Sequence, residues 1–283
     1  MKMIIKDFFD QNTSTISYVV HDEKTNKCAI IDPVMDYEPA SGKVFYESVT
    51  KIIKFIQENN LQLEWILETH IHADHLTAAS YLKEKLGGKI AIGEGIIGVL
   101  EYWTKIFNIG DEVPIDGSLF DNIFKNEEIF KIGNLEAKFL STRGHTPACG
   151  SYHVGDSVFV GDLIMAPNIG TGRTDFPEGS AKEQFKSLQK ILSLPADTRI
   201  FSGHDYPKGG EGPCLASSVL IQKKENIFAK INNEKEYILA REEKDRALHV
   251  PKLLFPAIQI NLRCGNFPNR EGGVSYLKIP LKE

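Results

Sequence analysis

Apolar and polar positions along the chain first predict strands, and they predict them in pairs. Residues 14–35 form strand, turn and strand, since the apolar runs 16–20 and 29–31 flank the polar stretch 22–27. Short strands return in the second half, where the pattern predicts them over 129–132, 136–140, 151–154, 157–160 and 199–201. Hairpins are therefore expected twice in the chain.

Apolar residues at three- and four-residue steps predict helices between these strands. Helices are expected over about 44–60, 76–86, 181–194 and 215–231, and buried strands over 63–67 and 89–92. Residues 94–125 are less regular. A Pro/Gly-rich stretch, a highly charged segment and an apolar, proline-punctuated run end the chain, over 207–213, 234–246 and 253–262. The pattern indicates two packed sheets flanked by helices.

Composition narrows the class of function. The 283 residues include 42% hydrophobic ones, which is enough for a large core. The net charge is −5 and lysines and arginines form no dense block. A nucleic-acid surface or an anionic-membrane surface is therefore disfavoured, and a small-molecule partner is expected.

Apolar runs and cysteines bear on the cellular compartment. No run approaches the ~18 apolar residues of a membrane helix, and the apolar start is too short for the core of a secretory signal. The four cysteines are widely spaced, which favours reduced thiols over disulfides or a thiolate zinc site. They are Cys28, Cys149, Cys214 and Cys264. We therefore expect a cytoplasmic protein.

Metal-ligating side chains gather where a predicted buried strand passes into a helix. The stretch from Glu68 to His75 holds three histidines and an aspartate, namely His70, His72, Asp74 and His75. Imidazole and carboxylate are natural ligands of zinc and iron, and a strand-to-helix loop lets alternate side chains converge on one ion. A solvated His-rich loop is the alternative interpretation.

Two more histidines and an aspartate end other predicted strands, each beside a glycine. They are His145 after Gly144, Asp162 after Gly161 and His204 after Gly203. Glycine permits a tight exit from the strand and a close approach to an ion. A metal site is thus the economical interpretation of the whole set. The remaining histidines, His21, His153 and His249, are expected on the surface or in ordinary packing.

Together these motifs resemble the metallo-β-lactamase superfamily over roughly residues 10–210. The resemblance implies an α/β fold, an αββα sandwich of two mixed sheets, with the metal at one edge. It implies a catalytic domain over residues 1–210 and a C-terminal helical and extended segment, 211–283, packed on the same domain. In two-metal hydrolases of that superfamily, such as glyoxalase II, one ion would be held by His70, His72 and His145, the other by Asp74, His75 and His204, and Asp162 would bridge them.

Finer motifs resemble the persulfide dioxygenases, also called sulfur dioxygenases. The stretch Gly172-Arg173-Thr174-Asp175-Phe176 carries most of this likeness, together with Ile31 to Val34, Gly144 to Cys149, His204 to Tyr206 and Asn261 to Gly265. Within that family the bacterial β-lactamase-hydrolase-like subgroup is nearest, given the stretches 81–88 and 276–281. Residues 163–171 depart from the family pattern, and Thr171 stands where a cysteine is often seen.

This second resemblance implies a different use of the same residues. One Fe(II) per chain would be held by His70, His145 and Asp162, a triad that leaves positions open for substrate and O2 together. The implied reaction oxidises glutathione persulfide with O2 to sulfite and glutathione, as in sulfide detoxification. Ligands and waters would then be oriented by His72, Asp74, His75 and His204.

Two residues are expected to contact the substrate. Arg173 is the candidate for a substrate carboxylate, because its planar guanidinium forms a two-point pair with such a group. A salt bridge with Asp175 is the alternative use of that guanidinium. Tyr206 is a weaker candidate contact.

Other functions stay open at this point. One is a dinuclear zinc thioester hydrolase of the glyoxalase II type, with Zn(II) in place of iron and a bridging hydroxide as nucleophile. Another is a metal-binding protein without enzymatic activity. Neither nucleic acid nor membrane is expected as a partner. A homodimer is one possible assembly, and the sequence does not reveal the oligomeric state.

Overall fold

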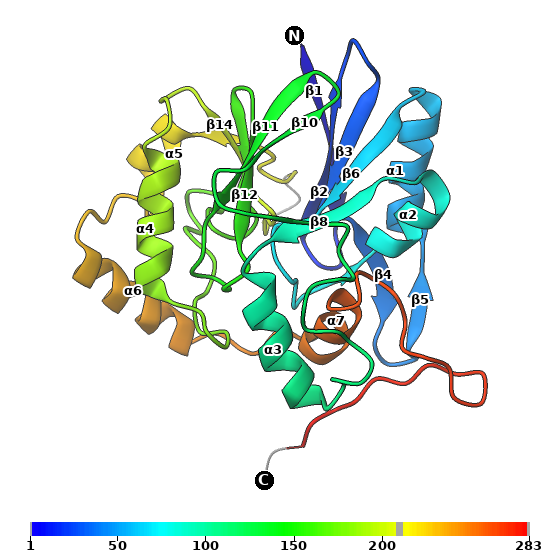
Figure 1. The fold of residues 1–283 in the computed structure, drawn as a ribbon. Coiled ribbons are helices and arrows are strands. Elements are labelled where there is room, and N and C mark those ends of the chain that lie inside the picture. Colours follow the sequence, from blue (N-terminus) through cyan, green and yellow to red (C-terminus); the bar gives the residue numbers. More distant parts are fainter. Residues whose placement is uncertain (1, 208–211, 282–283) are drawn as a thin grey trace.

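Two six-stranded sheets lie face to face at the centre of the structure, and helices cover both outer faces (Figure 1). This computed structural model describes residues 2–207 and 212–281. The first sheet has the order β1 (Met3–Asp10), β2 (Thr15–Asp22), β3 (Lys27–Ile31), β6 (Gln62–Leu67), β8 (Lys89–Gly93) and β9 (Asn122–Phe124). The second has the order β10 (Ile129–Ile132), β11 (Leu135–Ser141), β12 (Gly150–Val154), β13 (Ser157–Phe159), β14 (Arg199–Phe201) and β15 (Ser217–Ser218).

Both sheets mix parallel and antiparallel pairs, and a small third sheet lies beside them. In the first sheet β1, β2 and β3 are antiparallel neighbours, whereas β3, β6, β8 and β9 run parallel. In the second sheet only β13 and β14 are parallel. The third sheet has the order β5 (Lys43–Phe45), β4 (Val34–Glu38) and β7 (Leu76–Thr77).

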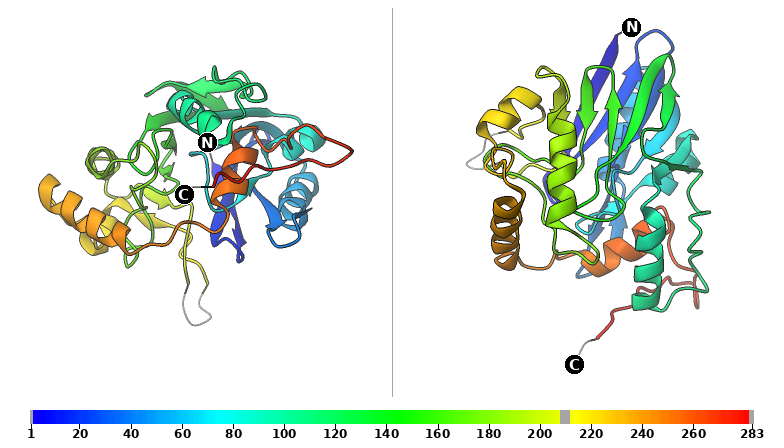
Figure 2. Two further views of the ribbon diagram at one scale, coloured as in Figure 1. Left: turned by 90° about the horizontal axis from the view of Figure 1, so that it is seen from below. Right: turned by 60° about the vertical axis from the view of Figure 1, so that its left-hand side comes forward.

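Helices form the two outer layers. The first sheet is covered by α1 (Glu47–Glu58), α2 (Ala79–Leu86) and α3 (Ile96–Phe107), and the second by α4 (Ala181–Leu192), α5 (Val219–Glu225) and α6 (Glu234–Arg246). The last helix, α7 (Leu254–Asn261), lies at one end of the sandwich (Figure 2). Among the described residues, no helix is both long and apolar enough to span a membrane.

Strand alternation explains the layers. On β2, Ile16, Tyr18 and Val20 point into the core between the two sheets, while Val19 points to the outer core under the helices. Successive side chains of a strand face opposite sides, so a strand buried on both faces must be apolar at nearly every position. The result is an αββα sandwich with one core between the sheets and one under each helical layer.

The predicted hairpins, the strands at 63–67 and 89–92, and the helix at 181–194 are present, with small shifts at their ends. All four cysteines are free, as predicted. Other predictions are wrong. The irregular stretch 94–125 contains α3, which sequence analysis missed although its buried residues Ile96, Val99, Leu100, Trp103 and Phe107 have helical spacing.

Two predicted helices are shorter than expected. The helix at 76–86 begins only at Ala79, because Leu76 and Thr77 pair with β4. The helix at 215–231 ends at Glu225, because the buried side chain of Asn226 accepts from the backbone N–H groups of Phe228 and Ala229 and turns the chain. Sequence analysis also missed β1, β4 and β5.

Candidate metal centre

The predicted metal ligands meet at one edge of the sandwich. His145, Asp162 and His204 follow β11, β13 and β14, which run in the same direction, so their carboxyl ends share an edge. From the other sheet, β6 leads into the loop 68–75, which we call the metal loop. An isolated bridge between Thr15 and His204 joins the two sheets here. Open α/β sheets bind ligands at such strand ends.

Three ligand atoms from different loops form a first set. His70, His145 and Asp162 each offer one atom, and these atoms lie within 4.8 Å of one another. Nε2 of His145 is 3.5 Å from Oδ2 of Asp162, and the rings of His70 and His145 have centroids 4.9 Å apart. All three residues are buried.

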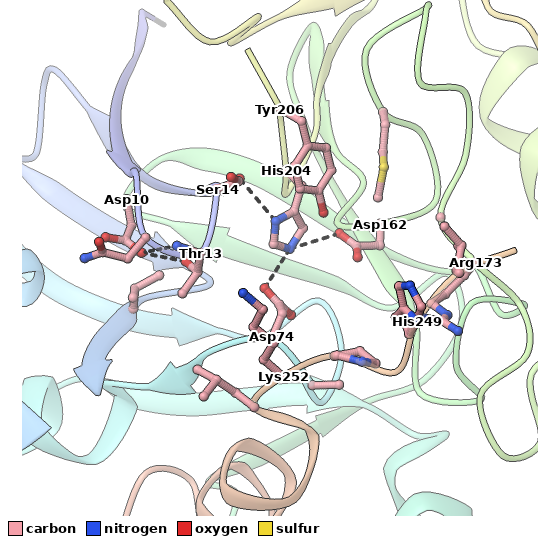
Figure 3. A pocket seen from close by; sticks show the side chains of 18 of the residues that line it. Asp10, Thr13, Ser14, Asp74, Asp162, Arg173, His204, Tyr206, His249 and Lys252 are labelled. Atoms are coloured by element: carbon pink, nitrogen blue, oxygen red, sulfur yellow. Dashed lines mark hydrogen bonds and ion pairs between the residues drawn. The ribbon is translucent and has the colours of Figure 1, made fainter. Parts of the chain in front are cut away.

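A second set lies directly beside the first. It consists of His72, Asp74 and His75, again within 4.8 Å of one another. Nε2 of His204 lies 3.2 Å from Oδ2 of Asp74 and 3.5 Å from Oδ1 of Asp162 (Figure 3). The two carboxylate oxygens of Asp162 therefore face different sets. The structure brings all seven residues together.

In three of the site histidines, a hydrogen bond from Nδ1 leaves Nε2 available to a metal. Nδ1 of His145 lies 2.6 Å from the Arg173 carbonyl, and Nδ1 of His204 lies 3.2 Å from the Ser14 carbonyl. A carbonyl only accepts, so each Nδ1 donates and each Nε2 keeps its lone pair. His75 has the same arrangement, since its Nδ1 lies 3.1 Å from the carbonyl of Leu76.

His70 is oriented through a hydroxyl. Thr69 Oγ1 donates to Oδ2 of Asp32 at 2.8 Å and therefore accepts from Nδ1 of His70 at 3.0 Å. Asp32 also accepts from the Thr69 backbone N–H at 2.7 Å. This relay leaves Nε2 of His70 toward the site, as a metal ligand requires.

His72 is turned the other way, by two buried carboxylates. Its Nε2 lies 3.0 Å from Oδ1 of Asp32 and 3.6 Å from Oε2 of Glu68. The nitrogen between these carboxylates carries the proton, so Nδ1 is the atom left for a metal. Sequence analysis did not predict this role for Asp32 or Glu68, because a single acidic residue at the end of a strand is too weak a pattern to indicate it.

Several buried polar atoms of the site lack a partner, which is what metal ligands show when the ion is not counted. Within residues 2–207 and 212–281, no hydrogen bond reaches Nδ1 of His72, Nε2 of His75, Nε2 of His204 or Oδ1 of Asp162. Leaving such atoms buried and unpaired is costly. Imidazole nitrogens and a carboxylate suit Zn(II) and Fe(II), so the residues present fit a bound metal.

The site histidines fall into two groups, one with a lowered pKa and one with a raised pKa. Burial and the neighbouring charge of His72 hold the pKa of His70 well below its usual range, and burial also lowers the pKa of His145. Burial opposes the charged form of His72, yet Asp32 outweighs it and raises the pKa of His72 to about 10. His204 is similar, because Asp162 and Asp74 overcome its burial and raise its pKa. Metal binding at these two histidines must therefore displace protons.

Two glycines allow the strand ends to approach this closely. Gly161 has a φ of +51°, and a Cβ there would lie 2.5 Å from the Thr69 hydroxyl. A Cβ on Gly172 would lie 2.3 Å from the Asp162 carbonyl, which accepts from the Gly172 N–H at 2.9 Å. A larger side chain at either position would push a metal-ligand loop outward.

The segment 172–176 is built against His145. The Arg173 carbonyl accepts from the His145 ring, and the Phe176 ring meets that imidazole edge to face, with centroids 5.1 Å apart. The Arg173 guanidinium is already engaged: it donates to both oxygens of Asp175, at 2.6 and 2.7 Å, and to the His249 carbonyl at 2.7 Å. The salt bridge that was the alternative interpretation is therefore present.

A large pocket opens onto the metal ligands. Its volume is about 1010 Å³, and its lining includes Asp74, His145, Asp162 and His204. Charges of both signs line the pocket. The carboxylates come from Asp10, Asp36, Glu38 and Glu47, and the cations from Arg173, Arg241, Lys244 and Lys252. In Figure 3, Asp10 and Arg173 lie on either side of the metal ligands.

The other predicted contact, Tyr206, also lines this pocket. Tyr206 is half exposed, and its ring is nearly parallel to that of His204, with centroids 6.1 Å apart. Of the three histidines assigned to surface or packing, His249 lines the pocket, while His21 and His153 lie in β2 and β12, away from it. His249 is exposed, as predicted, although sequence analysis did not place it beside the pocket.

The comparisons with known proteins agree with this fold. A sequence model of the metallo-beta-lactamase superfamily matches residues 12–204. The chain belongs to the metallo-beta-lactamase superfamily. The crystal structure of ETHE1 from Myxococcus xanthus is similar to it with a TM-score of 0.75 and 28% identity, covering 93% of this chain and 100% of that one.

Related sequences carry several different names. The chain is 45% identical to a beta-lactamase hydrolase-like protein of Agrobacterium fabrum over 98% of its own length, but it spans only 64% of that relative. It is 44% identical to glyoxylase B2 of Dictyostelium discoideum, covering 99% of this chain and 97% of that protein. It is 27% identical to the mitochondrial persulfide dioxygenase ETHE1 of Homo sapiens, over 72% of this chain and 69% of that protein.

Proposed function

We propose that this chain is an iron-dependent persulfide dioxygenase that acts on glutathione persulfide. In the reaction, glutathione persulfide, O2 and water give glutathione, sulfite and two protons. The outer sulfur is oxidised and O2 is reduced, so no further electron donor is needed. The proposal rests on the first ligand set, the pocket beside it and the segment 172–176.

The observation that carries the proposal is the separate set of two histidines and one carboxylate. His70, His145 and Asp162 meet within 4.8 Å. Two of them, His145 and Asp162, also line the pocket, so a ligand in the pocket reaches the same centre. Fe(II) bound by such a triad would offer adjacent open positions and the redox chemistry that a persulfide and O2 require.

The protein side chains supply orientation and charge. The Arg173 carbonyl and the Phe176 ring hold His145 in place from the segment that resembles the persulfide dioxygenases. The pocket accommodates a tripeptide-sized ligand, and its acidic and basic lining residues complement a molecule that carries both an ammonium group and carboxylates. Arg173 uses three of its N–H groups internally, and a guanidinium has five, so it can still donate to a substrate carboxylate.

A dinuclear zinc thioester hydrolase is the second candidate, and one observation favours it. Oδ1 of Asp162 faces His204, while Oδ2 faces His145, which is the arrangement of a bridging carboxylate between two ions. The set of His72, Asp74 and His75 would hold the second ion. The name glyoxylase B2 of the Dictyostelium relative also supports this candidate.

Metal content and oxygen uptake together decide between the candidates. The chain is freed of metal, loaded with Fe(II) or Zn(II) without air, and assayed with glutathione persulfide in an oxygen electrode and with a glutathione thioester. We expect one iron per chain, oxygen uptake with the persulfide and matching sulfite release. Two zincs per chain with thioester cleavage and no oxygen uptake would overturn the proposal.

A pair of histidine variants controls this experiment. His145→Ala should abolish iron binding and oxygen uptake while the chain stays folded, because it removes a ligand at the sheet edge and no core volume. His153→Ala removes a half-buried histidine of β12 outside the site, so iron content and uptake should stay near wild type. Full iron occupancy in the His145 variant would exclude it as a ligand.

A further inference from the structure

The side chain of Asn261 joins the C-terminal helix α7 to the metal loop. It is only 2% exposed. Its Nδ2 donates to the backbone carbonyls of His72 and His75, at 2.9 Å each, and its Oδ1 accepts from the backbone N–H of Thr77 at 2.8 Å. One amide thus bonds three backbone groups of a segment that lies more than 180 residues away, as the spacings of 184, 186 and 189 show.

These hydrogen bonds act on the part of the loop that carries the second ligand set. Residues 70–75 lie outside the helices and strands, so their buried carbonyls cannot all be satisfied by regular secondary structure. The backbone positions of His72 and His75 decide where their free ring nitrogens lie. A shift of the loop by even a fraction of an ångström would misplace them, since metal geometry tolerates about 0.2 Å.

We propose that Asn261 is a positioning residue of the metal centre, through which the docking of α7 and the binding of metal stabilise each other. The backbone geometry that Asn261 holds is the one that presents His72 and His75 to an ion. Any coupling of this kind is reciprocal: metal should strengthen the attachment of α7, and α7 should strengthen metal binding. The proposal rests on the metal centre and holds whether the ion is iron or zinc.

The same helix offers a matched control. Gln259 is 1% exposed and also makes three amide hydrogen bonds. It donates to the carbonyls of Phe255 and Lys278 at 2.9 and 2.8 Å, and it accepts from the Lys278 N–H at 2.9 Å. These partners belong to α7 and the chain after it, and none is in the metal loop. Gln259 therefore matches Asn261 in chemistry and burial but not in its target.

The test compares Asn261→Leu with Gln259→Met, each close in volume to the residue it replaces. Zn(II) affinity is measured by competition with a chromophoric chelator, and stability of the metal-free chain by urea unfolding. Both variants should unfold at lower urea than wild type. Only Asn261→Leu should weaken zinc binding, by the ~10–100-fold typical of groups that support metal ligands. Gln259→Met should stay within about twofold, as for independent sites. Equal zinc affinities in the two variants would overturn the proposal.

Two further measurements keep the proposal testable if Asn261→Leu does not fold. Asn261→Asp keeps the acceptor for Thr77 but loses both donors, so wild-type zinc affinity in that variant would refute the proposal. In the wild-type chain, zinc should slow amide hydrogen exchange in α7 more than in α5, and equal protection of the two helices would also refute it. Neither result depends on oxygen uptake, so failure of the proposed activity would leave this inference intact.

Discussion

Replacing Arg241 of α6 by methionine should cost a large part of the stability of this protein. The guanidinium is 1% exposed. It donates to Oδ1 of Asp245 at 2.7 Å and to the Thr171 carbonyl at 2.8 Å, and it lies 4.6 Å from the centre of the Phe228 ring. Methionine roughly keeps the volume but removes the charge and every donor.

The magnitude follows from what the variant leaves behind. Asp245 is 3% exposed and would keep only its two hydrogen bonds from Thr174, from the backbone N–H and the hydroxyl, at 2.9 Å each. Removing one partner of a buried ion pair costs about 3–5 kcal/mol, because the other charge stays buried and uncompensated. Two lost hydrogen bonds to charged groups, at about 1.5–3 kcal/mol each, lead to a similar figure.

Urea unfolding followed by circular dichroism measures this loss, and α6 provides the control. Arg246 lies five residues further along the same helix and is exposed, so Arg246→Met should change the free energy of unfolding by no more than about 0.5 kcal/mol. If Arg241→Met costs no more than Arg246→Met, the buried pair does not hold α6 to the segment 171–174 and this reasoning is wrong.

Three more predictions concern the site itself. His204→Ala should keep its iron and lose activity by ~10–100-fold if the centre holds one metal; loss of one equivalent from a two-metal protein would support the hydrolase instead. Arg173→Lys should raise KM for glutathione persulfide more than for a small persulfide without carboxylates, because lysine lacks the planar fork; an equal effect on both would mean that the guanidinium only pairs with Asp175. In the metal-free chain, burial and the charge of His72 lower the pKa of His75 to about 4. Between pH 6.5, the ordinary pKa, and pH 4, the unfolded chain binds a proton at this residue and the folded chain does not, so the free energy of unfolding decreases as the pH falls. His75→Gln should therefore flatten the dependence of the unfolding free energy on pH in that interval. An unchanged slope would contradict that assignment.

The cluster of candidate metal ligands could be predicted from the sequence because their chemistry is local. His70, Asp162 and His204 each follow an apolar strand, and a polar residue just beyond a buried strand has few structural uses other than a site. Parallel strands end at a shared edge, so a pattern of strand ends also predicts that these residues meet. The alternation of apolar residues likewise predicted most strands of both sheets.

Two helix errors have different causes. Helix α3 could have been predicted, because Ile96, Val99, Leu100, Trp103 and Phe107 form an apolar stripe at helical spacing. The end of α5 depends on Asn226, whose side chain is buried against the Gly170 carbonyl, a contact between segments 56 residues apart. No local pattern contains that information.

Tertiary structure alone decided which partners the buried charged and amide side chains bind. Composition shows 234–246 only as a charged segment, yet Arg241 and Asp245 are buried there, because α6 packs over the loop that contains Thr171. In the same way, α7 brings Asn261 to the metal loop. The sequence by itself thus determined the ligand chemistry, the layers and the family. Only the packing of distant segments determined which side chains hold those ligands in place, because a buried polar group takes its partner from whichever segment the fold places beside it.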